Sequence, residues 1–299
     1  MTSVTQPKTK IVAQPTGFPH ATIERVGWTI VAWLLFVILV LGPLLTVLAF
    51  SLTPSVFKGV QPTTLEWYRH IFSGPSNYGP LVRSLEVAAI VVLVQIVFGT
   101  LIAYGSVRRR VYFAGALDAM SNITIAVPSV VVGLSLLSFY GAYGPIASLG
   151  SFLFGTPLSL TWTLAIVVLA HVLETFPYMV RSVTAGLLRI DPHLEGAARS
   201  LGASRWQVFR TITLPQLRPS LVAGSVLTLS RSIAEFGATI IVVSAVLRTA
   251  PVAIYSDAES GALESAAAYS VILMLVSFTA YLLMRRFVMR DEELSRAAA

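Results

Sequence analysis

The chain has 299 residues, of which 55% are hydrophobic and 12% are charged, and its mean hydropathy is +0.77. A soluble domain carries about 25% charged residues, so this composition excludes an ordinary soluble domain and indicates a protein with several membrane-spanning segments. The net charge of +7 favours basic cytoplasmic loops over a nucleic-acid partner. The chain has no cysteine, which excludes disulfides and thiolate metal sites.

Residues 1–27 are polar and contain proline, which indicates a cytoplasmic N-terminal tail. A helix needs about 20 apolar residues to cross a membrane. The sequence therefore predicts an all-α, polytopic membrane protein with a single transmembrane domain over residues 28–290 and a cytoplasmic C-terminal tail over residues 291–299. Six apolar stretches are predicted to be its transmembrane helices: Trp28–Phe50, Leu85–Val107, Leu117–Tyr140, Leu160–Tyr178, Leu221–Val246 and Ala266–Met284.

The segments between these stretches differ in charge. Basic residues are concentrated in both tails, after the second stretch and in the loop of residues 189–218, whereas the other connections hold few. Because Lys and Arg are retained on the cytoplasmic side, both termini and this loop are predicted to be cytoplasmic. On the outer side, a short interfacial helix is expected over Leu65–Ser73, and Gly141–Ser159 is expected to be an outer loop or a re-entrant piece.

The loop of residues 189–218 carries a series of helix start and stop signals. Asp191 and Pro192 suit the N-cap and the first position of a helix that runs to about Leu201. Gly202 is suited to ending that helix, and Ser204 with Gln207 forms a capping box for a second one. The residues alone are compatible with a loop that packs on the protein's own bundle and with a surface helix that binds anionic lipid.

The same loop resembles the signature of binding-protein-dependent ABC importer permeases. In that pattern Glu-Ala-Ala is followed by three residues, Gly, nine residues, Ile, one residue and Leu-Pro. The match keeps every spacing and uses Ala197, Ala198, Gly202, Ile212, Leu214 and Pro215. The resemblance implies a cytoplasmic coupling helix that docks on the ATP-binding subunit, with contacts expected from Leu194, Glu195, Gly196, Ala197, Ala198, Arg199, Leu201, Gly202 and Arg205.

The chain departs from this signature at one position. Gly196 stands where the pattern has glutamate, and Glu195 precedes it. A shift of one residue turns a side chain by about 100° on a helix, so Glu195 does not simply replace the missing carboxylate. Either the contact relies on the helix shape and the arginines, or another carboxylate in the complex compensates.

Ionisable residues also occur inside the predicted spans. Arg231 and Glu235 are four residues apart and are expected to share a helix face and to pair, and Glu174 lies in the fourth span with His171. Charged groups inside a membrane suggest a functional site, so Arg231, Glu235 and Glu174 are candidates for the translocation pathway, with an internal pair that locks the bundle as the alternative. His171 is expected to be a hydrogen-bonded core residue. The run from Glu235 to Ala238 resembles the sulfate, molybdate and phosphonate branch of these permeases, which implies an oxyanion cargo; iron and polyamine permeases carry similar helices.

The chain lacks the phosphate-binding loop of an ATPase and the common metalloprotease and serine hydrolase motifs. It is therefore expected not to be an enzyme, to hold no metal or other cofactor, and to rely on ATP bound by a partner. The resemblance implies three kinds of partner in the inner membrane system: a pair of ATP-binding subunits, an extracytoplasmic solute-binding protein, and a second permease copy or paralogue. A secondary transporter is the alternative from another class, but no clear internal repeat supports it.

Overall fold

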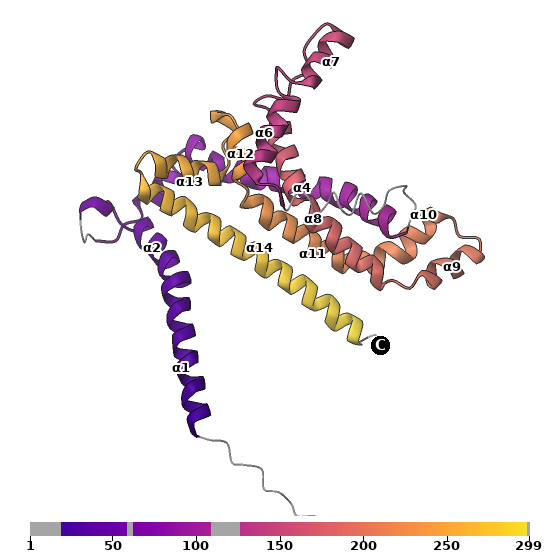
Figure 1. The fold of residues 1–299 in the computed structure, drawn as a ribbon, viewed down its shortest axis with the longest axis horizontal. Coiled ribbons are helices and arrows are strands. Elements are labelled where there is room, and N and C mark those ends of the chain that lie inside the picture. Colours follow the sequence, from indigo (N-terminus) through magenta and orange to yellow (C-terminus); the bar gives the residue numbers. More distant parts are fainter. Residues whose placement is uncertain (1–18, 59–61, 109–125, 298–299) are drawn as a thin grey trace, which may run out of the picture. The chain divides into compact units, whose positions relative to one another are not determined.

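The computed structural model describes residues 19–58, 62–108 and 126–297, and these ranges form helices and turns without any strand. The predicted all-α class is therefore confirmed. The chain divides into two compact units, one ending at Ala49 and one beginning at Phe50. The ribbon of each unit is drawn in Figure 1.

From residue 19 on, the first unit is one long, mostly apolar helix with a π-helical turn in its middle. It consists of α1 (Pro19–Phe36), a π-helical turn (Val37–Leu41) and α2 (Gly42–Ser51), whose last residues already belong to the second unit. Its apolar segment Val26–Ser51 is long enough to cross a membrane, and the hydrophobic part of this segment buries none of its residues. A helix that is hydrophobic on all sides is typical of a membrane span, which agrees with the first predicted span.

The second unit is built on three helices that pack side by side: α4 (Pro75–Val107), α8 (Leu164–Arg189) and α11 (Leu214–Ile233). The helices α9 and α10 lie at one end of this group and α13 lies toward the other (Figure 1). The remaining helices are α3 (Glu66–Ile71), α6 (Ser129–Tyr140), α7 (Pro145–Phe154), α9 (Pro192–Ser200), α10 (Arg205–Val208), α12 (Gly237–Val242), α13 (Ala250–Glu259) and α14 (Leu263–Ala297).

Five helical segments in the described ranges are long and apolar enough to span a membrane: Val26–Ser51, Pro75–Val107, Ser129–Phe154, Leu164–Arg189 and Leu263–Leu282. The prediction of one continuous helix over Leu221–Val246 is wrong, because α11 ends at Ile233 and α12 starts at Gly237. The first part of the predicted third span lies outside the described residues, and its later part is α6, which begins directly after Pro128. A short helix is present within Leu65–Ser73 as α3, and the segment Gly141–Ser159 contains α7.

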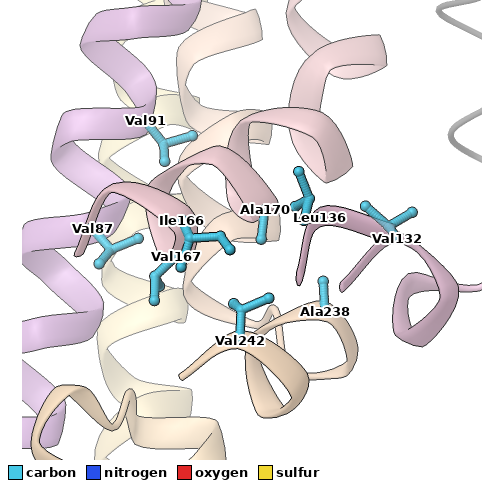
Figure 2. Packing of buried hydrophobic residues seen from close by; sticks show 9 residues of the cluster. All are labelled: Val87, Val91, Val132, Leu136, Ile166, Val167, Ala170, Ala238 and Val242. Carbon is cyan, nitrogen blue, oxygen red and sulfur yellow. The ribbon is translucent and has the colours of Figure 1, made fainter. Parts of the chain in front are cut away.

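The largest apolar core of the second unit joins α4, α6, α8 and α12. Figure 2 shows the side chains of α12 meeting those of α6 and α8 at its centre. Small and branched residues dominate it, which lets the short α12 approach its neighbours closely. The buried members are Val87, Val91, Val132, Leu136, Ile166, Val167, Ala170, Ala238 and Val242.

Three glycines allow neighbouring helices to approach closely. A Cβ atom at Gly133 would lie 2.6 Å from the carbonyl oxygen of Ala238, so α6 and α12 are in backbone contact there. A Cβ atom at Gly224 would lie 2.8 Å from Sδ of Met179, and one at Gly237 would overlap the side chain of Ser129. These contacts bring α11 against α8 and α12 against α6.

Candidate functional site

The loop between α8 and α11 begins with a capped helix. Oδ1 of Asp191 accepts a hydrogen bond from the backbone N–H of His193 at 2.8 Å, and Pro192 occupies the first turn of α9. The helix ends at Ser200 with Leu201 as its C-cap, and Gly202 follows with φ of +88°. This left-handed conformation favours glycine, so the predicted start and stop of the helix are both confirmed.

A second capped helix follows immediately. The backbone N–H of Ser204 donates to Oε1 of Gln207 at 2.7 Å, and the backbone N–H of Gln207 donates to Oγ of Ser204 at 3.3 Å. This is the predicted capping box. The chain continues from α10 through a π-helical segment (Phe209–Thr213) into α11, with Pro215 in its first turn. The loop is therefore a structured helix–glycine–helix unit that leads directly into the bundle.

One side of α9 carries exposed apolar groups. Leu194 is 48% exposed and Leu201 is 90% exposed, and Ala197 between them is also exposed. Residues three and four apart lie on one helix face, so these three side chains form a continuous surface, which we call the docking face. A Cβ atom at Gly196 would meet no other atom within 4 Å, so this position also has room for a side chain.

Two arginines of this loop, Arg199 and Arg205, are exposed. Arg199 donates from Nε to the carbonyl oxygen of Glu195, one turn earlier in its own helix, at 3.1 Å. Arg205 begins α10 and is exposed. Arg199 follows the buried Glu195 by four residues and so lies on the side of α9 away from the docking face, and Arg205 lies with Leu101 and Tyr104 of α4.

Glu195 differs from the other predicted contact residues, because its side chain points into the protein and is 2% exposed. Its Oε1 accepts from Nη2 of Arg108 at 2.9 Å and from Nε of Arg108 at 3.2 Å. The same oxygen accepts from Oγ1 of Thr213 at 2.9 Å. Glu195 thus joins α9 to the end of α4 and to the segment before α11, and it does not belong to the docking face in this structure.

The second cluster of predicted residues lies at the break between α11 and α12. Nη1 of Arg231 lies 2.7 Å from Oε2 of Glu235, and Nη2 of Arg231 lies 3.3 Å from Oε2 of Glu174. Oε1 of Glu235 accepts from the backbone N–H of Ala238 at 2.9 Å. The structure therefore brings all three residues together, and the side chain of Glu235 explains why one helix ends and another starts here.

The same break is held from α8 by His171. One ring nitrogen of His171 lies 2.8 Å from Oγ of Ser232 in α11, and the other lies 2.8 Å from Oγ1 of Thr239 in α12. His171 is therefore a hydrogen-bonded core residue, as predicted. Ser232 and Thr239 are not among the residues that the sequence singles out, although polar residues inside an apolar stretch are a signal that points to them.

A further buried polar contact joins α4 to α8. Nε2 of Gln95 donates to the carbonyl oxygen of Val172 at 2.7 Å and to Oγ1 of Thr175 at 3.2 Å. Polar side chains of α8 therefore contact α4 on one side and the break after α11 on the other. Among the residues described, no group of three His, Asp or Glu side chains is arranged to hold a metal ion.

Comparison with known proteins agrees with the loop pattern. The family model described as "Binding-protein-dependent transport system inner membrane component" matches residues 95–290. The molybdenum transport system permease protein of Escherichia coli (strain K12) is 38% identical over 210 residues, which are 69% of this chain and 91% of that protein. The sulfate transport system permease protein of Salmonella typhimurium (strain LT2) is 33% identical over 201 residues, or 67% of this chain and 72% of that protein.

A solved structure has the same fold. A bacterial ABC transporter involved in the import of the acidic polysaccharide alginate contains a chain that matches with a TM-score of 0.69. The match covers 91% of this chain and 98% of that one, at 18% sequence identity. At this identity the likeness shows the fold alone.

Proposed function

Because the chain belongs to the family of binding-protein-dependent transport system inner membrane components, and is a multi-pass membrane protein and a permease subunit of an ABC importer, we propose that it forms the pathway for a small oxyanion. We further propose that α9 is the helix by which an ATP-binding partner drives this pathway. The chain itself carries no phosphate-binding loop, so ATP is bound and hydrolysed by that partner.

The observation that carries the coupling role is the docking face on α9. Leu194, Ala197 and Leu201 are exposed on a short helix whose two ends are both capped, in a loop rich in arginine. An apolar helix face with a charged rim suits the insertion of a helix into a groove of a partner protein. We propose that the exposed Arg199 and Arg205 pair with acidic groups of the ATP-binding subunit.

The oxyanion cargo is supported by the relatives, which are named for molybdenum and sulfate transport and are 38% and 33% identical to this chain. Molybdate and sulfate are both tetrahedral oxyanions of two negative charges, so one pathway chemistry serves both. Iron and polyamines, the alternative cargoes, are not named for either relative.

The remaining assembly follows from the family and from charge. We propose that a solute-binding protein delivers the anion from outside, that a second copy or a paralogue of this chain completes the pathway, and that both termini are cytoplasmic. The basic residues of the loop at 189–218 support this orientation, since positive loops are retained in the cytoplasm.

The pathway role of Arg231, Glu235 and Glu174 stays a prediction. Arg231 keeps one third of its side chain exposed while both carboxylates are buried against it. An anion that approaches Arg231 would therefore meet a guanidinium that two carboxylates already neutralise. The geometry supports the alternative more strongly, in which these residues stabilise the break between α11 and α12.

The test is uptake by proteoliposomes that contain this chain with its ATP-binding subunit. Loaded binding protein and radiolabelled molybdate or sulfate are added outside, with ATP or a non-hydrolysable analogue inside. The proposal predicts uptake that requires hydrolysable ATP and binding protein and that unlabelled oxyanion competes away. Uptake by the chain alone, driven by an ion gradient, would instead identify a secondary transporter.

A further inference from the structure

The end of α4 and the start of α9 are fastened together by a buried ion pair. Glu195 is 2% exposed and the side chain of Arg108 is 12% exposed, so both charges are largely removed from water. Both Nε and Nη2 of Arg108 donate to Oε1 of Glu195. Such a pair holds its helices in a fixed geometry, because separating the partners would leave a buried charge without compensation.

Thr213 brings a third segment to the same oxygen atom. Its hydroxyl is fully buried and donates to Oε1 of Glu195, and Thr213 is the last residue before α11. One carboxylate oxygen in α9 therefore holds both the C-terminal end of α4 and the N-terminal start of α11. The two helices that it reaches pack against α8 and against each other.

An aromatic contact supports this connection one turn away. The rings of Tyr104 and Phe209 meet edge to face with centroids 5.3 Å apart, and Phe209 stacks on Trp206 at 5.7 Å. Tyr104 and Arg108 are four residues apart and so lie on the same face of α4. The last turn of α4 is thus attached to the loop at two points, one ionic and one aromatic.

We infer that Glu195 is a positioning residue that transmits movement of α9 to α4 and α11, and that it does not contact the ATP-binding subunit. The inference rests on the proposed function of α9. When the partner displaces the docking face, the buried contacts of Glu195 require the ends of α4 and α11 to move with it. The carboxylate that precedes Gly196 therefore acts on the membrane side of α9, while the exposed residues act on the partner side.

The experiment compares transport with ATP hydrolysis in the assembled importer. Glu195→Gln and Arg108→Gln remove the charges of the ion pair and keep side chains of similar size. The matched controls are Glu259→Gln and Arg69→Gln, because both residues are exposed and lie outside the loop of residues 189–218. Arg108→Lys keeps the charge but loses the planar group that donates twice, so it is expected to retain more uptake than Arg108→Gln.

If the ion pair couples α9 to α4 and α11, breaking it is expected to lower the uptake per ATP hydrolysed by about tenfold in Glu195→Gln and in Arg108→Gln. The amount of assembled complex, measured by size-exclusion chromatography, is expected to stay at the wild-type level. The double variant is expected to be no worse than either single one, since the two changes break the same contact. The controls keep the wild-type ratio.

Two results would overturn the inference. Uptake per ATP that is unchanged in both variants would show that the ion pair transmits nothing. A loss of assembled complex with a normal ratio in the remaining complex would show a role in folding alone. If the wild-type complex itself shows no ATP-dependent uptake, the proposed function fails along with the inference, so the two failures are distinguishable.

Discussion

Arg231 and Glu235 form an ion pair across the end of α11, with 2.7 Å between Nη1 and Oε2. The pair joins the last turn of α11 to the residues that precede α12, and Glu235 also accepts from the backbone N–H of Ala238. One buried carboxylate therefore holds both sides of the helix break. This arrangement explains how a chain with an apolar stretch at residues 221–246 avoids forming one continuous helix there.

The first prediction concerns Glu235. Glu235→Ala removes both the partner of Arg231 and the acceptor for Ala238, whereas Glu235→Gln keeps an acceptor oxygen. Removing one member of a buried ion pair lowers the free energy of unfolding by about 3–5 kcal/mol. Because Arg231 keeps Glu174 as a partner, we expect Glu235→Ala to lose an amount near the lower end of this range. Glu235→Gln is expected to lose less. Thermal unfolding of the purified protein in detergent measures both. Equal stability of the two variants would contradict the capping role, and Glu259→Ala is the exposed control.

The second prediction concerns His171, which bridges Ser232 and Thr239. His171→Ala leaves two buried hydroxyls without this partner, which is expected to cost about 1–3 kcal/mol of stability for each unpaired group. His70→Ala, at an exposed histidine in α3, is expected to be neutral. In a cycle with Thr239→Val, the two changes should be non-additive, because they remove the same hydrogen bond. Strict additivity would show that the bridge carries no energy.

The third prediction concerns the contact of α6 with α12. Gly133→Ala places a methyl group 2.6 Å from the carbonyl oxygen of Ala238, and the neighbour is backbone that cannot rotate away. We expect a loss of about 1–3 kcal/mol in unfolding free energy, as for other overpacked sites. Gly27→Ala is the matched control, since a Cβ atom there meets nothing within 4 Å. A stable Gly133→Ala protein would mean that α12 is not held against α6.

The fourth prediction concerns orientation in the membrane. The chain has no cysteine, so single introduced cysteines report one position each. Tyr143→Cys, at a fully exposed residue between α6 and α7, is expected to react with a membrane-impermeant maleimide in intact cells. Leu201→Cys is expected to react only after the cells are permeabilised. The reverse pattern would place the docking face outside and would contradict the importer account.

Local rules in the sequence are sufficient for much of the candidate site. Asp191, Gly202 and Ser204 each act through a neighbour within a few residues, so the capped helices of the loop can be predicted from the sequence alone. The close-approach glycines at 133, 224 and 237 can be predicted in the same way, because small residues inside spans have few other uses.

Long-range contacts do not follow from such local rules. From the sequence, Glu195 is predicted to contact the partner, because its neighbours in the loop are predicted to do so. Its side chain is buried through a contact with Arg108, which lies 87 positions earlier in the chain. The break after α11 is hidden because the flanking residues are apolar on both sides, and hydropathy does not distinguish one long helix from two short ones. The break is held by contacts between distant groups: Glu235 with Arg231 and with the N–H of Ala238, and His171 with Ser232 and Thr239.

The measurement that tests the central claim most directly is the protection of α9 by the ATP-binding subunit. Leu201→Cys is labelled with a maleimide in the chain purified alone and in its complex with the ATP-binding subunit, and Tyr143→Cys is labelled in parallel. If the docking face inserts into the partner, labelling of Leu201→Cys is lost in the complex while labelling of Tyr143→Cys is unchanged. Equal labelling of Leu201→Cys in both samples would show that the partner does not cover α9 and would contradict the proposed coupling.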